Sequence, residues 1–451
     1  MDKLRRTVVL FLCLLGGLAA AELPMKIQRL LDSATGMRHG FLGLLIVNAA
    51  TGEVLFESNQ THLFVPASNS KLFTTALGLA RLGPDQRFHT TVVAGREPDG
   101  EGLRAIEDLA DQVAARGVRR IDGDIVGDDS AYVWEPYPGG WGVGDAVWEY
   151  GAPVSALTIN DNSFTLNLHP GEPARISIDP ALEFYQIDNL VELGSPKHIR
   201  IEREPGSRQL RIWGVLPRND PGVTEILAIH DPALYAAVAL RDALERRGVA
   251  IRGTAVARHS LPGAPITPSS GFELARLDSA PLIEGLRVAA KVSQNLHAEM
   301  ILRAVGRARR GTGSQEAGLE EMRVFLKEIG VPASEYRLDD GSGLSRTSLV
   351  TPEAVVKLLR FMYRSPYREN WLSLLPVGGE DGTLRRRMRD TTAAGRIHAK
   401  TGSLTHVTTL SGYAERKDGT MLAFSFLANN QNVPAAEVRA VIDKICVLMT
   451  E

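Results

Sequence analysis

The spacing of hydrophobic positions predicts short strands near both ends of the chain. Apolar or alternating runs bounded by turn residues are typical of strands, and five such runs stand out. They are residues 40–48, 54–57, 395–400, 407–415 and 421–428. Turns at 401–403 and 417–419 divide the last three runs, which favours an antiparallel meander. We expect these strands to complete one sheet, so that the first and last thirds of the chain form one domain.

Helical spacing of apolar residues marks four segments, and the middle of the chain has a different pattern. The predicted helices are residues 26–33, 68–77, 231–247 and 433–449. Between them, residues 122–178 and 199–215 contain short β-like runs with many glycines and prolines, and residues 249–256 resemble one further strand. We therefore predict a β-rich region inserted into the main domain.

These patterns predict three parts of the chain. They are a signal peptide at 1–21, a main domain at 22–92 with 262–451, and an inserted region at 93–261. We expect the inserted region to form two small domains, 93–165 with 225–261 and 166–224. The length of 451 residues supports more than one domain, because it exceeds what a single hydrophobic core usually serves.

The N-terminal segment has the pattern of an export signal. Three basic residues precede an apolar run at 8–18, which closes on small residues at 19–21. The run is too short for a comfortable membrane span, and no second long apolar run follows it. A lipid anchor on Cys13 is disfavoured, because Leu12 stands where a lipoprotein signal needs a small residue. We predict a periplasmic protein whose mature chain has no transmembrane segment.

Charge and cysteine content exclude some classes of protein. The formal net charge is −2 at pH 7, and neither sign is concentrated in a tail. This balance gives no electrostatic case for binding nucleic acid or a strongly anionic membrane surface. Without the signal peptide, Cys446 is the single cysteine, so an internal disulfide is excluded and packed cores must supply the stability. We expect Cys446 to be buried in the last helix.

Three short motifs lie far apart in the chain and together fit an acyl-transferring serine enzyme. They are Ser68-Asn69-Ser70-Lys71, Ser293-Gln294-Asn295 and Lys400-Thr401-Gly402. Each motif alone is weak evidence. Ser68 could simply cap a helix, the second motif could be surface residues that open a helix, and the third could be the end of a hairpin. The presence of all three motifs in this order is specific evidence for such an enzyme.

The first motif has the geometry that nucleophilic catalysis needs. A serine hydroxyl is a poor nucleophile unless a base lies within hydrogen-bonding reach. Ser68 is predicted at the start of a helix, and residues three apart share a helix face, so Lys71 can reach the Ser68 hydroxyl. A lysine serves as a base only when its pKa is lowered, which burial and a second ammonium both favour. Lys400 is the candidate for that second charge.

The motifs and three further segments resemble the class C, low-molecular-weight penicillin-binding family of D-alanyl-D-alanine carboxypeptidases and endopeptidases. The further segments are residues 154–162, 339–345 and 378–384. Gln294 departs from the commoner aspartate of its motif, at a position whose side chain faces away from the reaction. The resemblance covers nearly the whole chain after residue 21. It implies an α/β (α+β) fold of the serine β-lactamase and DD-peptidase type, with an antiparallel sheet flanked by helices and with inserted β-rich domains.

The resemblance also implies roles for individual residues. Ser68 would attack the carbonyl of the penultimate D-alanine, and Lys71 would take its proton. Ser293 would pass a proton to the leaving amine, and Asn295 would bind the peptide and orient Lys71. Backbone N–H groups of Ser68 and Ser403 would stabilise the oxyanion. The substrate-binding residues would be Lys400, Thr401, Gly402 and Ser403, with Lys400 and Thr401 on the terminal carboxylate.

The implied substrate is a peptidoglycan stem peptide, and penicillins would acylate the same serine. Asp145 lies in a glycine-rich segment that resembles the part of the family over the active site, where it could pair with a side-chain ammonium of the stem peptide. An exposed loop acid is the alternative. No cofactor or metal is implied, and His297 and His398 are expected to be structural. The sequence leaves open carboxypeptidase against endopeptidase preference, a β-lactamase, a non-catalytic wall-binding scaffold, and the oligomeric state.

Overall fold

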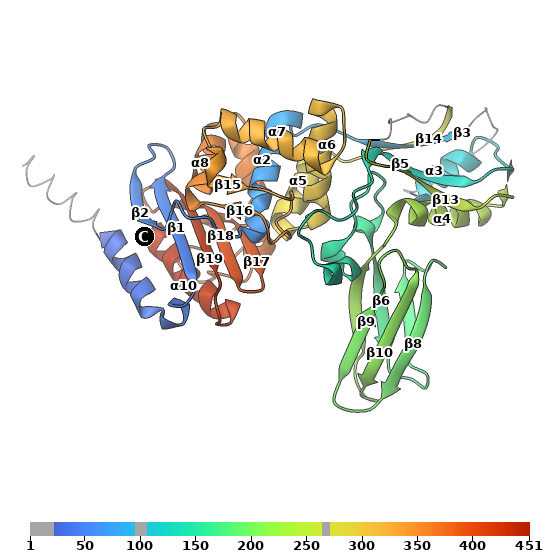
Figure 1. The fold of residues 1–451 in the computed structure, drawn as a ribbon, viewed down its shortest axis with the longest axis horizontal. Coiled ribbons are helices and arrows are strands. Elements are labelled where there is room, and N and C mark those ends of the chain that lie inside the picture. The colour runs from blue at the N-terminus through green and yellow to red at the C-terminus, as the bar shows by residue number, and fades with distance from the viewer. Residues whose placement is uncertain (1–21, 95–105, 264–270) are drawn as a thin grey trace, which may run out of the picture. The chain divides into compact units, whose positions relative to one another are not determined.

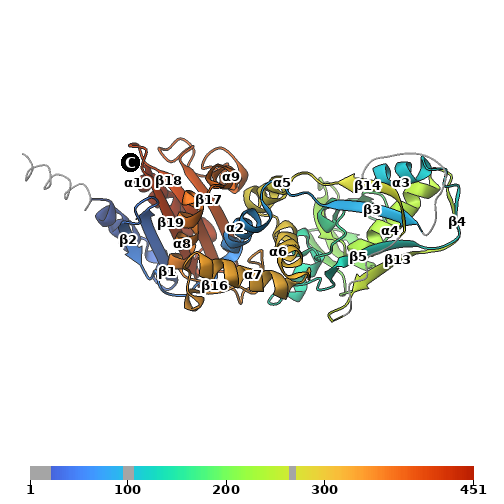
Figure 2. The same cartoon turned by 90° about the horizontal axis from the view of Figure 1, so that it is seen from above.

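The computed structural model describes residues 22–94, 106–263 and 271–451, so the predicted signal peptide lies outside the described residues (Figures 1 and 2). Contacts between residues divide the chain into two compact units. Unit 1 contains residues up to Pro84, Ile283–Gln294 and Leu319–Glu451. Unit 2 contains Asp85–Leu282 and Asn295–Gly318.

A five-stranded sheet forms the centre of unit 1, in the order β17-β18-β19-β1-β2. Its strands are β1 (Phe41–Asn48), β2 (Val54–Ser58), β17 (Ile397–Leu404), β18 (Val407–Glu415) and β19 (Met421–Asn429). All neighbours are antiparallel, and β1 pairs with β19 along its whole length. The predicted sheet built from both ends of the chain is therefore confirmed.

Helices cover both faces of this sheet. Nearly every residue of β18 and β19 is buried, which requires cover on both sides. One face packs on α10 (Ala435–Thr450) and the N-terminal helix at 22–33, and the other on α8 (Pro352–Arg364). The remaining helices and short strands that lie wholly or mostly in this unit are α2 (Ser70–Leu82), α5 (Leu282–Arg287), α7 (Gln315–Glu328), α9 (Arg368–Leu374), β15 (Tyr336–Arg337) and β16 (Leu349–Val350). Cys446 is buried and free, as expected.

One predicted turn is wrong. Residues 401–403 were expected to end a strand, but β17 continues to Leu404 and turns at Thr405 and His406. Gly402 is paired with Thr409 inside the ladder. Glycine usually signals a turn, whereas here it permits close approach of another segment to the strand.

Unit 2 contains a small β-sandwich and an α/β part. The sandwich packs sheet β8-β10-β9 against sheet β11-β6-β7 around one apolar core. Its strands are β6 (Ser163–His169), β7 (Arg175–Asp179), β8 (Gln186–Leu193), β9 (His198–Glu202), β10 (Gln209–Leu216) and β11 (Val223–Ala228). A second core joins α3 and α4 to three strand pairs. These elements are α3 (Ile106–Ala114), α4 (Pro232–Glu245), β3 (His89–Ala94), β4 (Arg120–Ile121), β5 (Ile125–Val133), β12 (Ala250–Ile251), β13 (Ala255–Ser260) and β14 (Phe272–Asp278), and α6 (Asn295–Arg310) completes the unit.

The borders of unit 2 lie outside the predicted insertion at 93–261. The strand β3 pairs with β14, so residues on both sides of the predicted borders belong together. Residues 295–318 also join this unit, although they were assigned to the main domain. Within the three described stretches, no helix is long and apolar enough to cross a membrane.

Candidate active site

Ser68 lies in a tight turn that leads into a helix of unit 1. The 3-10 turn η2 (Ala67–Asn69) immediately precedes α2. Ala67 has a φ of 48°, in the left-handed region that a residue with a Cβ rarely adopts, and it is fully buried. The amide of Asn69 donates to the carbonyl of Lys400 at 3.1 Å. The strained turn is thus tied to the edge strand β17, and it presents Ser68 beside that strand.

Lys71 lies one helical turn after Ser68 and is fully buried. Its Nζ is 3.0 Å from Oγ of Ser68, as the spacing of three residues predicts. The same Nζ donates to the backbone carbonyl of Ser342 at 2.7 Å. The amine is therefore held against the hydroxyl by a second, fixed contact.

The loop that carries Ser342 is organised by a buried carboxylate. Asp340 accepts from the hydroxyls of Ser342 and Ser348, at 2.8 and 3.1 Å, and from the backbone N–H of Gly343 and Ser345, at 3.1 and 2.9 Å. A Cβ on Gly343 would come within 1.8 Å of the carbonyl of Ala67. The segment 339–345 resembled the family, but no role at the site was predicted for it. Its contribution is the backbone carbonyl of Ser342. Every residue type has a backbone carbonyl, so the sequence does not indicate this role.

Ser293 and Lys400 form a second serine and lysine pair. Ser293 follows the π-helical turn η6 (Val288–Val292) and has a φ of 69°. Lys400, on β17, is fully buried and donates to Oγ of Ser293 and to the carbonyl of Thr401, both at 2.8 Å. The structure thus brings Ser68, Lys71, Ser293 and Lys400 together within unit 1.

Electrostatics at Lys400 favour its neutral form. Burial, with the nearby Lys71 as a second cause, holds the pKa of Lys400 well below its ordinary value. Such a lysine binds fewer protons in the folded than in the unfolded chain. The free energy of unfolding should therefore rise with pH, from the lowered pKa up to the ordinary value of 10.5.

Replacing Lys400 with methionine should remove this pH dependence. We expect wild type to gain stability relative to Lys400→Met as pH rises from about 7 to about 9. Deprotonation of Lys400 removes the free-energy cost of burying its ammonium group, and the variant has no such group. Urea unfolding at both pH values measures the difference. Lys417→Met, at an exposed lysine, is the control. If the difference in the free energy of unfolding between wild type and Lys400→Met were the same at both pH values, the expectation would be wrong.

Gly402 allows β17 to approach the turn that bears Ser68. A Cβ at this position would lie 2.2 Å from Oγ1 of Thr409, 2.9 Å from the carbonyl of Pro66 and 3.0 Å from the backbone nitrogen of Ser68. No substituent fits there without moving backbone, so the glycine fixes the distance between the strand and Ser68.

Gly402→Ala should therefore separate β17 from the Ser68 turn. We expect a loss of about 1–3 kcal/mol in the free energy of unfolding, as for overpacking elsewhere. For the acylation of Ser68 by penicillin that the resemblance implies, we expect a proportionally larger loss of rate. Urea unfolding and stopped-flow acylation measure the two effects. Gly123→Ala is the matched control, because a Cβ there would meet nothing within 4 Å. Acylation at the wild-type rate in Gly402→Ala would refute the role of this close approach.

The other predicted residues of β17 are accessible. Thr401 is partly exposed, and its hydroxyl donates to that of Thr383 at 2.8 Å, which brings the family-like segment 378–384 beside the strand. Ser403 is exposed, one residue beyond Gly402. Residues 376–378 pair with the start of β17, so a ligand along the outer edge of the strand would meet these two side chains beyond Lys400.

Asn295 and Asp145 belong to unit 2. Asn295 is the first residue of α6, and its amide donates to the carbonyl of Tyr150 at 2.7 Å. Asp145 accepts from the backbone N–H of Gly142 at 2.9 Å. Burial, then Asp145, raises the pKa of Tyr150. The roles expected for Asn295 and Asp145 at the substrate stay predictions.

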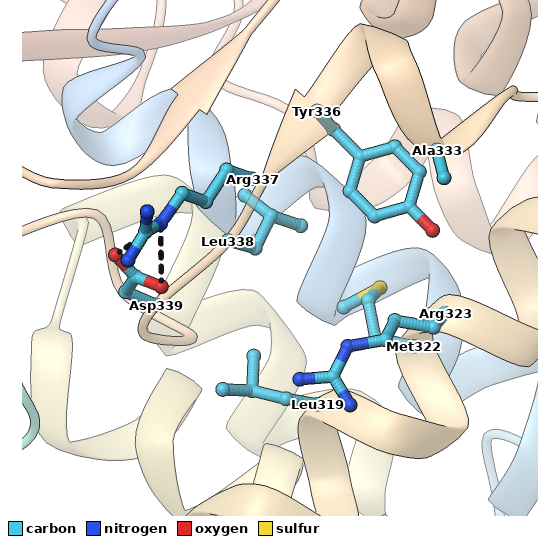
Figure 3. Close-up of a pocket in the computed structure, with 8 residues that line it drawn as sticks. All are labelled: Leu319, Met322, Arg323, Ala333, Tyr336, Arg337, Leu338 and Asp339. Atoms are coloured by element: carbon cyan, nitrogen blue, oxygen red, sulfur yellow. Dashed lines mark hydrogen bonds and ion pairs between the residues drawn. The ribbon is translucent and has the colours of Figure 1, made fainter.

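Three further features are one pocket and two histidines. A pocket of about 360 Å³ in unit 1 is lined by α7, β15 and the start of the 339–345 segment, where Arg337 turns toward Asp339 (Figure 3). None of the residues that line it is a predicted site residue. His297 contacts Asp161 at 2.9 Å, and burial lowers the pKa of His398.

The chain is similar in sequence or in fold to several known proteins. It is 35% identical to a D-alanyl-D-alanine carboxypeptidase of Actinomadura sp. (strain R39), over 96% of this chain and 86% of that protein. It is 28% identical to carboxypeptidase DacB of Mycolicibacterium smegmatis, over 88% of this chain and 79% of that protein. The crystal structure of penicillin-binding protein 4 (dacB) from Haemophilus influenzae superposes with a TM-score of 0.80 at 23% identity, over 92% of this chain and 97% of the other.

These likenesses agree with the geometry around Ser68. The fold is the predicted one, an antiparallel sheet flanked by helices with inserted β-rich regions. The profile of one family matches residues 25–451, which include every motif residue described above. The chain belongs to the D-Ala-D-Ala carboxypeptidase 3 (S13) family.

Proposed function

We propose that the protein is a serine-type D-Ala-D-Ala carboxypeptidase that acts on peptidoglycan stem peptides through an acyl-enzyme on Ser68. The observation that carries the proposal is the paired geometry of the two serines and two lysines. Nζ of Lys71 is 3.0 Å from Oγ of Ser68, and Nζ of Lys400 is 2.8 Å from Oγ of Ser293. Family membership and the 35% identity to a D-alanyl-D-alanine carboxypeptidase support the choice of substrate.

Acylation begins with the neutral amine of Lys71. Oγ of Ser68 attacks the carbonyl carbon of the penultimate D-alanine while its proton passes to Lys71. The contact from Nζ to the Ser342 carbonyl keeps the amine in line with the hydroxyl. The oxyanion of the tetrahedral intermediate accepts from the backbone N–H groups of Ser68 and Ser403. These donors act best because they are fixed before the substrate arrives.

Collapse of the intermediate needs a proton on the departing nitrogen. Ser293 delivers it to the amine of the terminal D-alanine and is replenished from the lysines. Its contact with Lys400 supports this relay. Water then attacks the acyl-enzyme while one of its protons passes to Lys71. As the bond between the acyl carbon and Oγ of Ser68 breaks, Lys71 returns the proton to this oxygen, and the shortened peptide leaves with a new carboxylate.

The side chains of β17 could donate hydrogen bonds to a substrate that ends in a carboxylate. Lys400 and Thr401 would hold this group, with Gly402 and Ser403 beside the peptide and Asn295 on its backbone. If the leaving amine belongs to a cross-linked peptide, the same steps give an endopeptidase. An exported, periplasmic location is part of the proposal, since the substrate lies outside the cytoplasm.

Mass spectrometry after incubation with benzylpenicillin, followed by an assay for D-alanine release from a stem pentapeptide, tests the proposal. A stable single adduct on Ser68 with D-alanine release would establish the carboxypeptidase. A short-lived adduct with rapid penicillin hydrolysis would favour a β-lactamase. Neither adduct nor release would favour a non-catalytic wall-binding scaffold, and both of these outcomes would overturn the proposal. A β-lactam complex of the Haemophilus influenzae relative supports penicillin as the probe.

A further inference from the structure

Thr383 places one more hydroxyl beside the part of β17 that is proposed to bind the substrate. It lies in the 3-10 turn η8 (Gly382–Leu384) of unit 1 and is exposed. Oγ1 of Thr401 donates to Oγ1 of Thr383 at 2.8 Å. Among the described residues, the hydroxyl of Thr383 donates to no acceptor, so its proton is available to a ligand. No step of the proposed mechanism uses Thr383.

Contacts with η6 and with the core hold the η8 turn in place. Gly382 has a φ of 52°, and a Cβ there would lie 2.6 Å from the carbonyl oxygen of Lys291 in η6. Leu384, at the end of the turn, is fully buried in the core of unit 1. Asp381, just before the turn, accepts from the backbone N–H of Val377 at 2.8 Å and forms an ion pair with Lys291. The hydroxyl on η8 is therefore positioned before a ligand arrives, which lowers the entropy that binding costs.

The nearby lysines leave a carboxylate in need of further donors. In the neutral form that its lowered pKa favours, Lys400 has two N–H groups. Its contacts with Oγ of Ser293 and with the carbonyl of Thr401 use both. The ammonium of Lys291 is committed to Asp381. A carboxylate that binds beside Thr401 therefore needs hydroxyl donors.

We propose that Thr383 is a specificity-determining residue, which binds the terminal carboxylate of the substrate together with Thr401. The inference rests on the proposed function and adds a residue to its substrate site. When a carboxylate enters, the two hydroxyls can exchange their mutual hydrogen bond for one donation each. Hydrogen bonds to an ionised acceptor are roughly twice as strong as those between neutral groups, so this exchange is favourable. Since a C-terminal amide carries no such charge, the pair selects peptides with a free C-terminus.

Two peptides test the proposal. One is a stem pentapeptide that ends in D-alanyl-D-alanine, and the other is the same peptide with a C-terminal amide. We expect Thr383→Val to lower kcat/KM for the free acid about 10- to 100-fold, the loss of one hydrogen bond to a charged group. The value for the amide should stay close to that of wild type. Mass spectrometry of released D-alanine and D-alaninamide gives the two values, and urea unfolding checks the fold.

Three further variants separate a direct contact from an effect through Thr401. If Thr383 itself binds the carboxylate, Thr383→Val lowers the free-acid value again in a Thr401→Val background. No further loss in that background would mean that Thr383 only orients Thr401, and would overturn the proposal. Thr383→Ser, which keeps the hydroxyl, should retain the preference for the free acid. Thr61→Val, at another exposed threonine of unit 1, is the control and should behave as wild type.

The same measurements distinguish a failure of this inference from a failure of the proposed function. D-alanine release by wild type with unchanged selectivity in Thr383→Val, or an equal loss with both peptides, would overturn the inference alone. If wild type released nothing from either peptide and formed no penicillin adduct on Ser68, the proposed function would fail and the inference with it.

Discussion

Replacing Ser68 with alanine is expected to abolish covalent labelling by a fluorescent penicillin and to lower D-alanine release by at least about 10⁴-fold. The proposed acyl-enzyme needs an oxygen at this position, and an amine of Lys71 or Lys400 does not lie where Oγ of Ser68 lies. Gel fluorescence and intact-mass spectrometry measure the adduct, and a coupled assay measures the product.

Ser70→Ala is the matched control for this experiment. Ser70 lies two residues further along, it is buried, and its Oγ has no hydrogen-bond partner among the described residues. The substitution removes a serine Oγ near the same helix start and leaves Lys71 unchanged. We expect Ser70→Ala to label as wild type does. Labelling that survives in Ser68→Ala would remove the proposed mechanism.

Replacing Lys71 with methionine is expected to slow acylation by about 10²–10⁴-fold, the usual contribution of a positioned base. Methionine fills most of the same buried space but cannot accept the proton of Ser68. It also leaves the carbonyl of Ser342 without its donor, at a cost of about 1–3 kcal/mol in the free energy of unfolding. Stopped-flow acylation and urea unfolding separate these effects.

Thr74→Val distinguishes a chemical role of Lys71 from a structural one. Thr74 donates to the carbonyl of Gly341 at 2.7 Å, next to the carbonyl that Lys71 holds. Its replacement should weaken the same loop by a similar amount while the base remains. We expect acylation close to the wild-type rate. If Thr74→Val were as slow as Lys71→Met, Lys71 would be a loop anchor rather than the base.

Local spacing predicts one of the two serine and lysine pairs, whereas the other depends on tertiary contacts. A serine and a lysine three apart on a helix must face each other, so Ser68 and Lys71 could be paired from sequence. No rule of sequence spacing pairs Ser293 with Lys400. These two side chains meet only in the folded chain, because the sheet places β17, which bears Lys400, beside Ser293. The role of the Ser342 carbonyl cannot be predicted from the sequence, since every residue has a backbone carbonyl.

The errors in the predicted fold have the same origin. Glycine at position 402 was interpreted as a turn, because glycine usually breaks strands. Its actual role depends on Pro66 and Ser68, which lie far away in sequence. Unit 2 extends beyond residues 93–261, because β3 pairs with β14 across a long stretch of chain. Periodicity describes one element at a time and does not identify its partner.

The pairing of β1 with β19 has a consequence for the timing of biosynthesis. Phe41 pairs with Asn429, so nearly the whole polypeptide must emerge before the central sheet can close. Until then, the turn that bears Ser68 has no β17 beside it, and a prematurely terminated chain cannot bring Lys400 to Ser293. Under the proposed mechanism, acylation is thereby confined to completed molecules.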